Sequence, residues 1–195
     1  MLHKKSILAL ALITAPLLAQ AAVTQGQLTF TWQATVPATE ILSTSWKFTD
    51  ATGNDYIPSV IALQASIDDN DSLNLVTQSP ATFEIRSSRA SNNLNSISAY
   101  LANVPNGTGI ISPLTLKTTL AAPSDDEVVV VLNGQALKSG SSNAVTIQST
   151  VNNNTAASMS LALYAKVSPG NYTPSSSISF STPVIFSVNV ADSPA

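Results

Sequence analysis

The amino-acid sequence predicts an all-β domain, a sandwich or a barrel, and three observations support this. Many short segments alternate apolar and polar residues with a period of two, which is the period of a half-buried strand. Turn-forming residues separate these segments. Charged residues make up only 10% of the chain and hydrophobic residues 44%, while Ser, Thr and Asn fill the polar positions. Exposed helices need more charge than this, whereas Thr, Ser, Val and Ile suit pleated sheets and turns.

The alternating segments follow one another without an internal repeat or a linker, so we expect one domain. The run from Glu127 to Leu132 is apolar throughout after its first residue, which predicts a strand buried on both faces. We expect no long helix, and at most one short helical turn near residues 91–94. The apolar residues that alternate in the other segments are Leu28–Val36, Trp46 and Phe48, Leu73 and Leu75, Phe83 and Ile85, Ile97 to Leu101, Leu114 and Leu116, Val145 and Ile147, Met159 to Leu163, Ile178 and Phe180, and Val184 to Val190.

Gly, Pro, Asn and Asp mark the turns between these strands. Asn133-Gly134 is the strongest such signal, because Asn-Gly favours the positive φ angles of a tight hairpin. Further turns are expected at residues 52–55, 79–80, 105–107, 140–142 and 169–171.

The first 21 residues have the pattern of a cleaved export signal. Lys4 and Lys5 precede an apolar run from Ile7 to Leu18, and Ala19-Gln20-Ala21 is a small-x-small cleavage site. The apolar run is too short for a membrane anchor, because a spanning helix needs roughly 20 residues. We therefore expect removal of residues 1–21, a mature chain that begins at Ala22, and export from the cell.

Removal of this segment leaves little catalytic chemistry. The single histidine, His3, is lost, and the chain has no cysteine, so neither an imidazole base nor a zinc site of the usual ligands remains. No phosphate-binding glycine motif is present. The mature chain keeps six basic and eleven acidic residues, a formal charge of −5, which argues against binding to nucleic acid or anionic membranes. We predict a protein that is not an enzyme and has no cofactor and no metal.

Two acidic clusters could in principle bind calcium or supply a pair of catalytic carboxylates. Counted from Asp69, an EF-hand loop would place Asn74 where glycine is needed and Pro80 where an acidic residue is needed. A secreted glycoside hydrolase would need two carboxylates at a defined separation, which the sequence does not indicate. We interpret Asp68-Asp69-Asn70-Asp71 and Asp125-Asp126-Glu127 as solvated turns.

The segment just after the export signal is a strictly amphipathic strand. Gln and Thr occupy one face, and Pro37 ends the strand because proline lacks a backbone donor. No tight turn connects it to the next segment. Its apolar face consists of Leu28, Phe30, Trp32, Ala34 and Val36.

The pattern Gly26-x-apolar-x-Phe30 after an export signal resembles the N-terminal extension of chaperone–usher fimbrial subunits, or pilins. Over most of its length the chain is similar to the major subunit of 987P-type fimbriae. The blocks that carry this resemblance are Lys5–Ala22, Gly26–Trp32, Leu132–Lys138 and Pro183–Val190.

The resemblance implies an immunoglobulin-like sandwich that lacks its last strand. Residues 22–37 would be a donor-strand extension and residues 38–195 the pilin body. A periplasmic chaperone would fill the open groove first, and the N-terminal strand of the next subunit would then replace it at the outer-membrane usher. We expect residues 22–36 to project from the body or to occupy a groove beside the C-terminal strand. The residues that would line the groove and meet the chaperone are Val184, Phe186, Val188 and Val190.

The resemblance also implies a place in a cell-surface fimbria, identical or related subunits as partners, and adhesion to a host receptor. The chain departs from the common pilin pattern in lacking a disulfide and in carrying the tail Ala191–Ala195. The alternative is a minor or tip adhesin that binds a host glycan or glycolipid. The single-domain length of this chain and its intact donor segment favour a subunit of the fimbrial shaft over a tip adhesin. The aromatic residues that could stack on a sugar are Trp46, Tyr56, Tyr100 and Tyr172.

Overall fold

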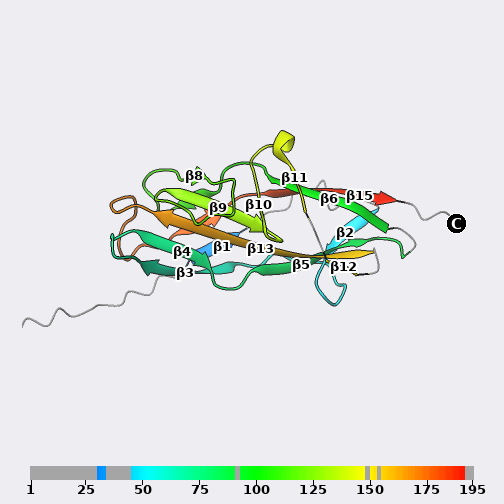
Figure 1. Ribbon diagram of the computed structural model, residues 1–195. Helices are drawn as coiled ribbons and strands as arrows, with labels where there is room; N and C mark the ends of the chain where they lie inside the picture. The colour runs from blue at the N-terminus through cyan, green and yellow to red at the C-terminus, as the bar shows by residue number, and fades with distance from the viewer. Residues whose placement is uncertain (1–29, 34–44, 91–92, 148–149, 153–154, 192–195) are drawn as a thin grey trace, which may run out of the picture.

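The computed structural model describes residues 30–33, 45–90, 93–147, 150–152 and 155–191. Strands and loops make up these residues, apart from one 3₁₀ turn at Ser141–Asn143. The strands form an elongated sandwich of two layers, and the C-terminal strand runs along one of them (Figure 1). The predicted export signal, residues 1–21, lies outside the described residues.

The larger sheet is organised around its longest strand, β13 (Ala156–Val167). One edge of β13 pairs with β4 and then β5, and the other edge pairs with β9 and β12. β3 extends the sheet from β4, and β2 extends it from β5. The remaining eleven strands of the twelve are β1 Phe30–Gln33, β2 Trp46–Thr49, β3 Ile61–Ile67, β4 Leu73–Thr77, β5 Ala81–Ser87, β7 Asn106–Thr108, β8 Thr115–Leu116, β9 Glu127–Leu132, β10 Gln135–Ala136, β12 Thr150–Asn152 and β14 Ser179–Ser181.

The smaller sheet faces this layer and has three strands in the order β11, β6 and β15. They span Val145–Thr146, Asn93–Leu101 and Val184–Ala191. β14 and β15 are separated only by Thr182 and Pro183, so one stretch of chain passes from the large sheet to the small one. Among the described strands, only β6 pairs with β15. The two open layers, antiparallel except where β1 meets β14 and β8 meets β9, form an immunoglobulin-like sandwich, in agreement with the predicted fold class.

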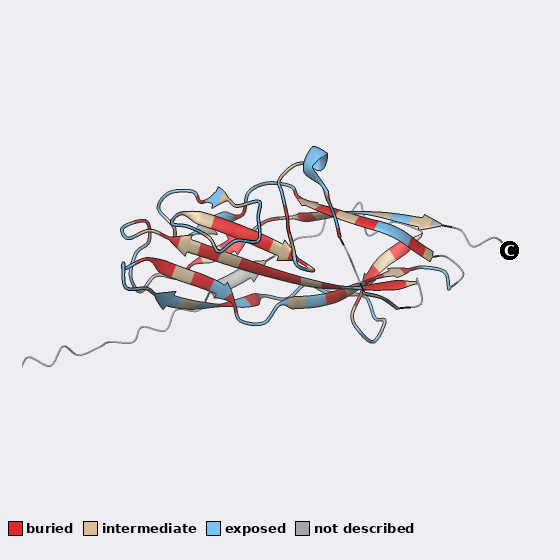
Figure 2. Ribbon diagram, viewed as in Figure 1, coloured by how far each residue is buried: buried red, intermediate tan, exposed pale blue. Residues whose placement is uncertain are grey.

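The core lies between the two layers, and Figure 2 shows the buried positions alternating along the strands. β9 confirms the predicted strand buried on both faces, because Val128, Val129 and Val130 are all at most 2% exposed. The Asn133-Gly134 turn is also confirmed. Both residues have positive φ, 48° and 74°, as they connect β9 to β10.

Three details differ from the sequence predictions. β3 was not predicted, although Ile61 and Leu63 are buried in it. The helical turn expected near residues 91–94 is wrong at Asn93 and Leu94, which begin β6 because they pair with the end of β15. Asn106–Thr108 forms β7, where a turn was expected, because this segment pairs with β14.

Candidate functional site: the seam between the sheets

The seam is the line along which β2 and β3 approach β14 and β15; β2, β3 and β14 belong to the large sheet and β15 to the small one. Two of the residues predicted to line a groove, Val184 and Phe186, are buried here at 2% and 3% exposure. Val188 and Val190 are half-buried and pack against the same core. The structure therefore brings the inward-facing residues of the C-terminal strand together with the first strands of the domain.

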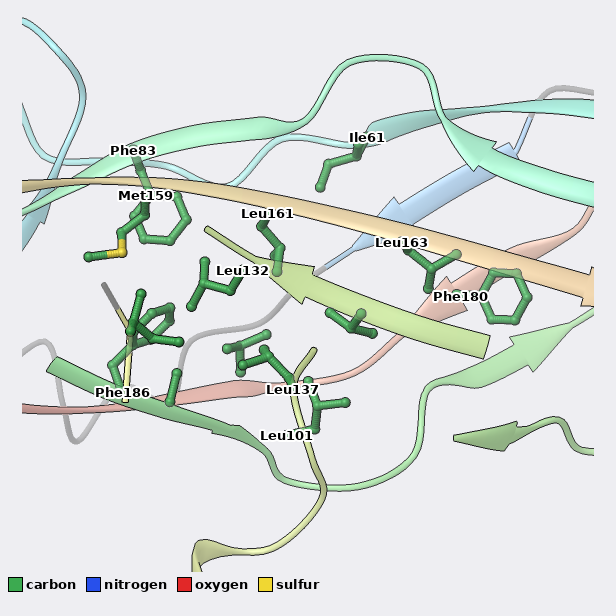
Figure 3. Packing of buried hydrophobic residues seen from close by; sticks show 14 of the residues in the cluster. Ile61, Phe83, Leu101, Leu132, Leu137, Met159, Leu161, Leu163, Phe180 and Phe186 are labelled. Carbon is green, nitrogen blue, oxygen red and sulfur yellow. The ribbon is translucent and has the colours of Figure 1, made fainter. Parts of the chain in front are cut away.

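An aromatic cluster bridges the seam where β2 faces β15. The rings of Phe48 on β2, Phe83 on β5 and Phe186 on β15 contact one another edge to face, with centroid separations of 5.3 to 5.8 Å. Trp46 and Tyr56 extend the cluster, each 5.1 Å from its neighbouring ring. Figure 3 shows Phe83 and Phe186 projecting from opposite layers into the same part of the core. Such contacts add about 0.5–1.5 kcal/mol each beyond simple burial.

The cluster leaves one small apolar pocket in the seam, with a volume of about 30 Å³. One water needs roughly 10–15 Å³, so the pocket can hold a water or a methyl group and not a further ring. An additional strand could enter the part of the seam beside this pocket only if the aromatic rings moved. The lining residues are Phe48, Tyr56, Pro58, Ser59, Ile61, Ala81, Phe83, Leu161, Val184 and Phe186.

At its other end the seam is occupied by β1. This strand pairs antiparallel with β3, where Phe30 lies opposite Leu63 and Trp32 opposite Ile61. On its other side it pairs in parallel with β14, where Trp32 lies opposite Phe180. The three partner residues on β3 and β14 are at most 7% exposed.

The structure thus places part of the predicted donor segment, Phe30–Gln33, inside the chain's own large sheet. The segment lies beside β14, which leads directly into the C-terminal strand, and these four residues do not project from the body. The other predicted donor residues, Leu28, Ala34 and Val36, lie outside the described residues.

The acidic cluster at residues 68–71 is a turn between β3 and β4, as predicted. The Lys166 ammonium lies 3.1 Å from an Asp68 carboxylate oxygen and 3.0 Å from one of Asp125. The hydrogen bond from Lys166 lowers the pKa of Asp68 to about 2, helped by the backbone N–H groups of Ser72 and Asn70. The same two carboxylates raise the pKa of Lys166. These charges therefore connect separate loops at one end of the sandwich.

The second acidic cluster has a similar structural role. Burial opposes ionisation of Asp126, but its carboxylate accepts hydrogen bonds from the backbone and hydroxyl of Ser168 and from Asn171, so its pKa is lowered overall. Asn171 is buried and in turn accepts a hydrogen bond from the Ser112 backbone. Within the described part of the chain, no group of three or more His, Cys, Asp or Glu residues is placed to hold a metal ion.

The outer face of the large sheet has a shallow hollow of about 520 Å³ near Glu84, Asn133, Ser158 and Ser160. Its one ionisable lining residue, Glu84, forms an ion pair with Arg86. The four aromatic residues considered for sugar stacking are not fully exposed. Trp46 is buried, and the tyrosines at 56, 100 and 172 are half-buried. The described ranges contain no helix long and apolar enough to cross a membrane.

Sequence reasoning missed the contribution of β2, β3 and β5 to the seam. Phe48 and Phe83 were identified as strand residues but not as the rings that meet the C-terminal strand. Alternation could indicate that they were buried, but only their placement opposite β15 shows that they form one wall of the seam.

The open sheets and the apolar seam define an immunoglobulin-like sandwich whose N-terminal strand lies in the seam. No family model matches the sequence. The chain is 32% identical to the CS5 fimbrial subunit of Escherichia coli over 199 residues, which cover 95% of this chain and 96% of that protein. The chain belongs to this family of fimbrial subunits.

Proposed function

We propose that this chain is the major structural subunit of a surface fimbria and that it polymerises by donor-strand exchange. Leu28, Phe30, Trp32, Ala34 and Val36 of one subunit would enter the seam of its neighbour. The observation that supports this most directly is the slot between β3 and β14, which already accepts residues from the donor segment. A strand added between two strand edges gains main-chain hydrogen bonds on both sides.

The seam offers the surface that the donor's alternating pattern requires. Its walls are the buried residues of β3, β14 and β15, including Ile61, Phe180 and Val184. Burial of each large apolar side chain contributes roughly 1.5–3 kcal/mol, so a donor with several such residues on one face would be held strongly. A polar residue on that face would lose this contribution.

The interface between subunits is head-to-tail, because the N-terminal segment of one molecule meets the seam of another. Such an interface does not close on itself and therefore propagates as a filament. Before assembly, a periplasmic chaperone would cover Val184, Phe186, Val188 and Val190, and an outer-membrane usher would mediate the exchange. The product is a cell-surface fimbria of the 987P type that supports adhesion to a host receptor. The role is structural and not enzymatic.

Replacement of Phe30 by Asp tests this function. The variant should still bind the chaperone but should not join a growing fibre, because a carboxylate would be buried in the neighbour's seam. Thr31→Asp is the matched control, because it introduces the same charge one residue away on the opposite face of the strand. Surface filaments and chaperone-bound subunit are measured for both variants. Equal filament yields from the two variants would contradict the donor assignment.

A further inference from the structure

We propose that the isolated subunit completes its own fold by holding β1 in its own seam, parallel to β14, and that β1 must leave before a neighbour's segment can enter. The exchange step rests on the proposed function, whereas the self-closed state rests on the strand pairing alone. The chain would then exist as a closed monomer that opens for assembly.

The pairing defines both the orientation and the register of this closed state. Thr31 lies opposite Ala62 on β3 and opposite Ser179 on β14. The carbonyl of Ala62 accepts a hydrogen bond of 2.9 Å from the Gln78 backbone N–H, so the backbone groups of Ala62 point toward β4. Thr31 and Ala62 are therefore a non-hydrogen-bonded pair, the type in which facing Cα atoms are closest, at about 4.5 Å.

The closed state is suited to being temporary. Within the described residues β1 spans Phe30–Gln33, and these are four of the nine residues over which the alternating apolar pattern runs, from Leu28 to Val36. Its contact with β14 is parallel, and parallel ladders are slightly less stable per residue than antiparallel ones. A donor that paired antiparallel at this edge of a neighbour's seam would form a more stable ladder there than β1 forms with β14.

Concentration would shift the balance between the two states. A segment tethered to its own seam has an effective concentration in about the millimolar range when the connection is short and flexible. Dilute subunits would therefore remain closed, while a high local concentration of subunits would favour exchange. The unpaired seam, an association hazard for an exported protein, would stay covered in the meantime.

A disulfide can test this register, because the chain has no cysteine of its own. Thr31→Cys combined with Ala62→Cys joins the facing pair, and Ala62 is exposed, so the substitution leaves the core unchanged. The matched control is Thr31→Cys with Gln64→Cys. Gln64 is also exposed and lies on the same face of β3, but two residues along the strand, where the Cα separation exceeds what a disulfide normally spans.

The exported chain would be unfolded, refolded at low concentration in reductant, and then oxidised. We expect nearly all of the Thr31–Ala62 variant to form an intramolecular disulfide, visible as faster migration without reductant and as a linked peptide by mass spectrometry. The control should form at least about tenfold less. Absence of the intramolecular bond, equal bonding in the control, or bonds only between molecules would overturn the closed state.

The same variants separate this proposal from the proposed function. The oxidised Thr31–Ala62 monomer should not enter filaments, and reduction should restore its entry. If the intramolecular bond forms but oxidised and reduced chains polymerise equally, donor-strand exchange by this segment is wrong while the closed monomer stands. If the bond never forms but Phe30→Asp still blocks filaments, the closed monomer is wrong while the proposed function stands.

Discussion

Among the residues of the seam, Phe48 is the one whose substitution should most strongly lower the free energy of unfolding. Its ring is 8% exposed and contacts three other rings, at 5.1 Å from Trp46, 5.8 Å from Phe83 and 5.3 Å from Phe186. Replacement by Ala removes buried apolar surface and leaves a cavity, and such changes cost about 3–5 kcal/mol. Phe48→Leu keeps much of the apolar volume and should therefore cost less.

The loss can be measured by urea unfolding of the dilute monomer, with the midpoint and the slope fitted separately. Lys47→Ala is the matched control, because this neighbour on β2 only forms an exposed ion pair with Asp55 and should change stability by less than about 0.5 kcal/mol. If the free energy of unfolding of Phe48→Ala matched that of the control, the aromatic cluster would not stabilise the seam.

Three further substitutions test other parts of the structure. The folded-state pKa of Asp68 is lowered from 3.8 to about 2, so the contribution of its carboxylate to stability should be present above pH 4 and be lost as the pH falls from 4 toward 2. The difference in unfolding free energy between wild type and Asp68→Asn, followed by acid unfolding, should therefore shrink over that range. A difference that stayed constant would contradict the ion pair with Lys166. Gly109→Ala should lower the thermal midpoint of unfolding far more than Gly134→Ala. Both glycines have positive φ, but an added Cβ at 109 would lie 2.3 Å from the Ser177 carbonyl oxygen, whereas one at 134 would meet no other atom within 4 Å. Similar midpoints for the two variants would refute this expectation. Thr77→Val should cost about 1–3 kcal/mol by chemical denaturation, because the buried Thr77 hydroxyl bonds both the carbonyl and the N–H of Leu163, and an unchanged midpoint would show that these bonds contribute nothing.

The strand pattern of the domain could be predicted because it depends on local alternation. β13 and β9 follow directly from the apolar residues at 159–163 and 128–132. β3 could have been predicted from the same signal, since Ile61, Leu63, Ala65 and Ile67 alternate with small or polar residues. β3 was omitted because the alternation between apolar and polar residues is weak there, since Ala62 stands where a polar residue is expected.

The seam could be predicted only in part, because its walls come from distant parts of the chain. An amphipathic strand at residues 28–36 was evident, but alternation does not say which strand edges it will meet. Its partners on β3 and β14 are about 30 and 150 residues away in sequence. The Lys166 bridge between Asp68 and Asp125 has the same origin, since only folding brings Lys166 on β13 beside the two loops that hold these carboxylates.

The fate of the N-terminal segment in the filament is the most direct test of the proposed function. A high-resolution reconstruction of purified filaments would show which molecule supplies the strand in each slot between β3 and β14. We predict continuous density from that strand to the body of the adjacent subunit. If, throughout the filament, the density connected each such strand to the same subunit whose slot it fills, donor-strand exchange would be contradicted.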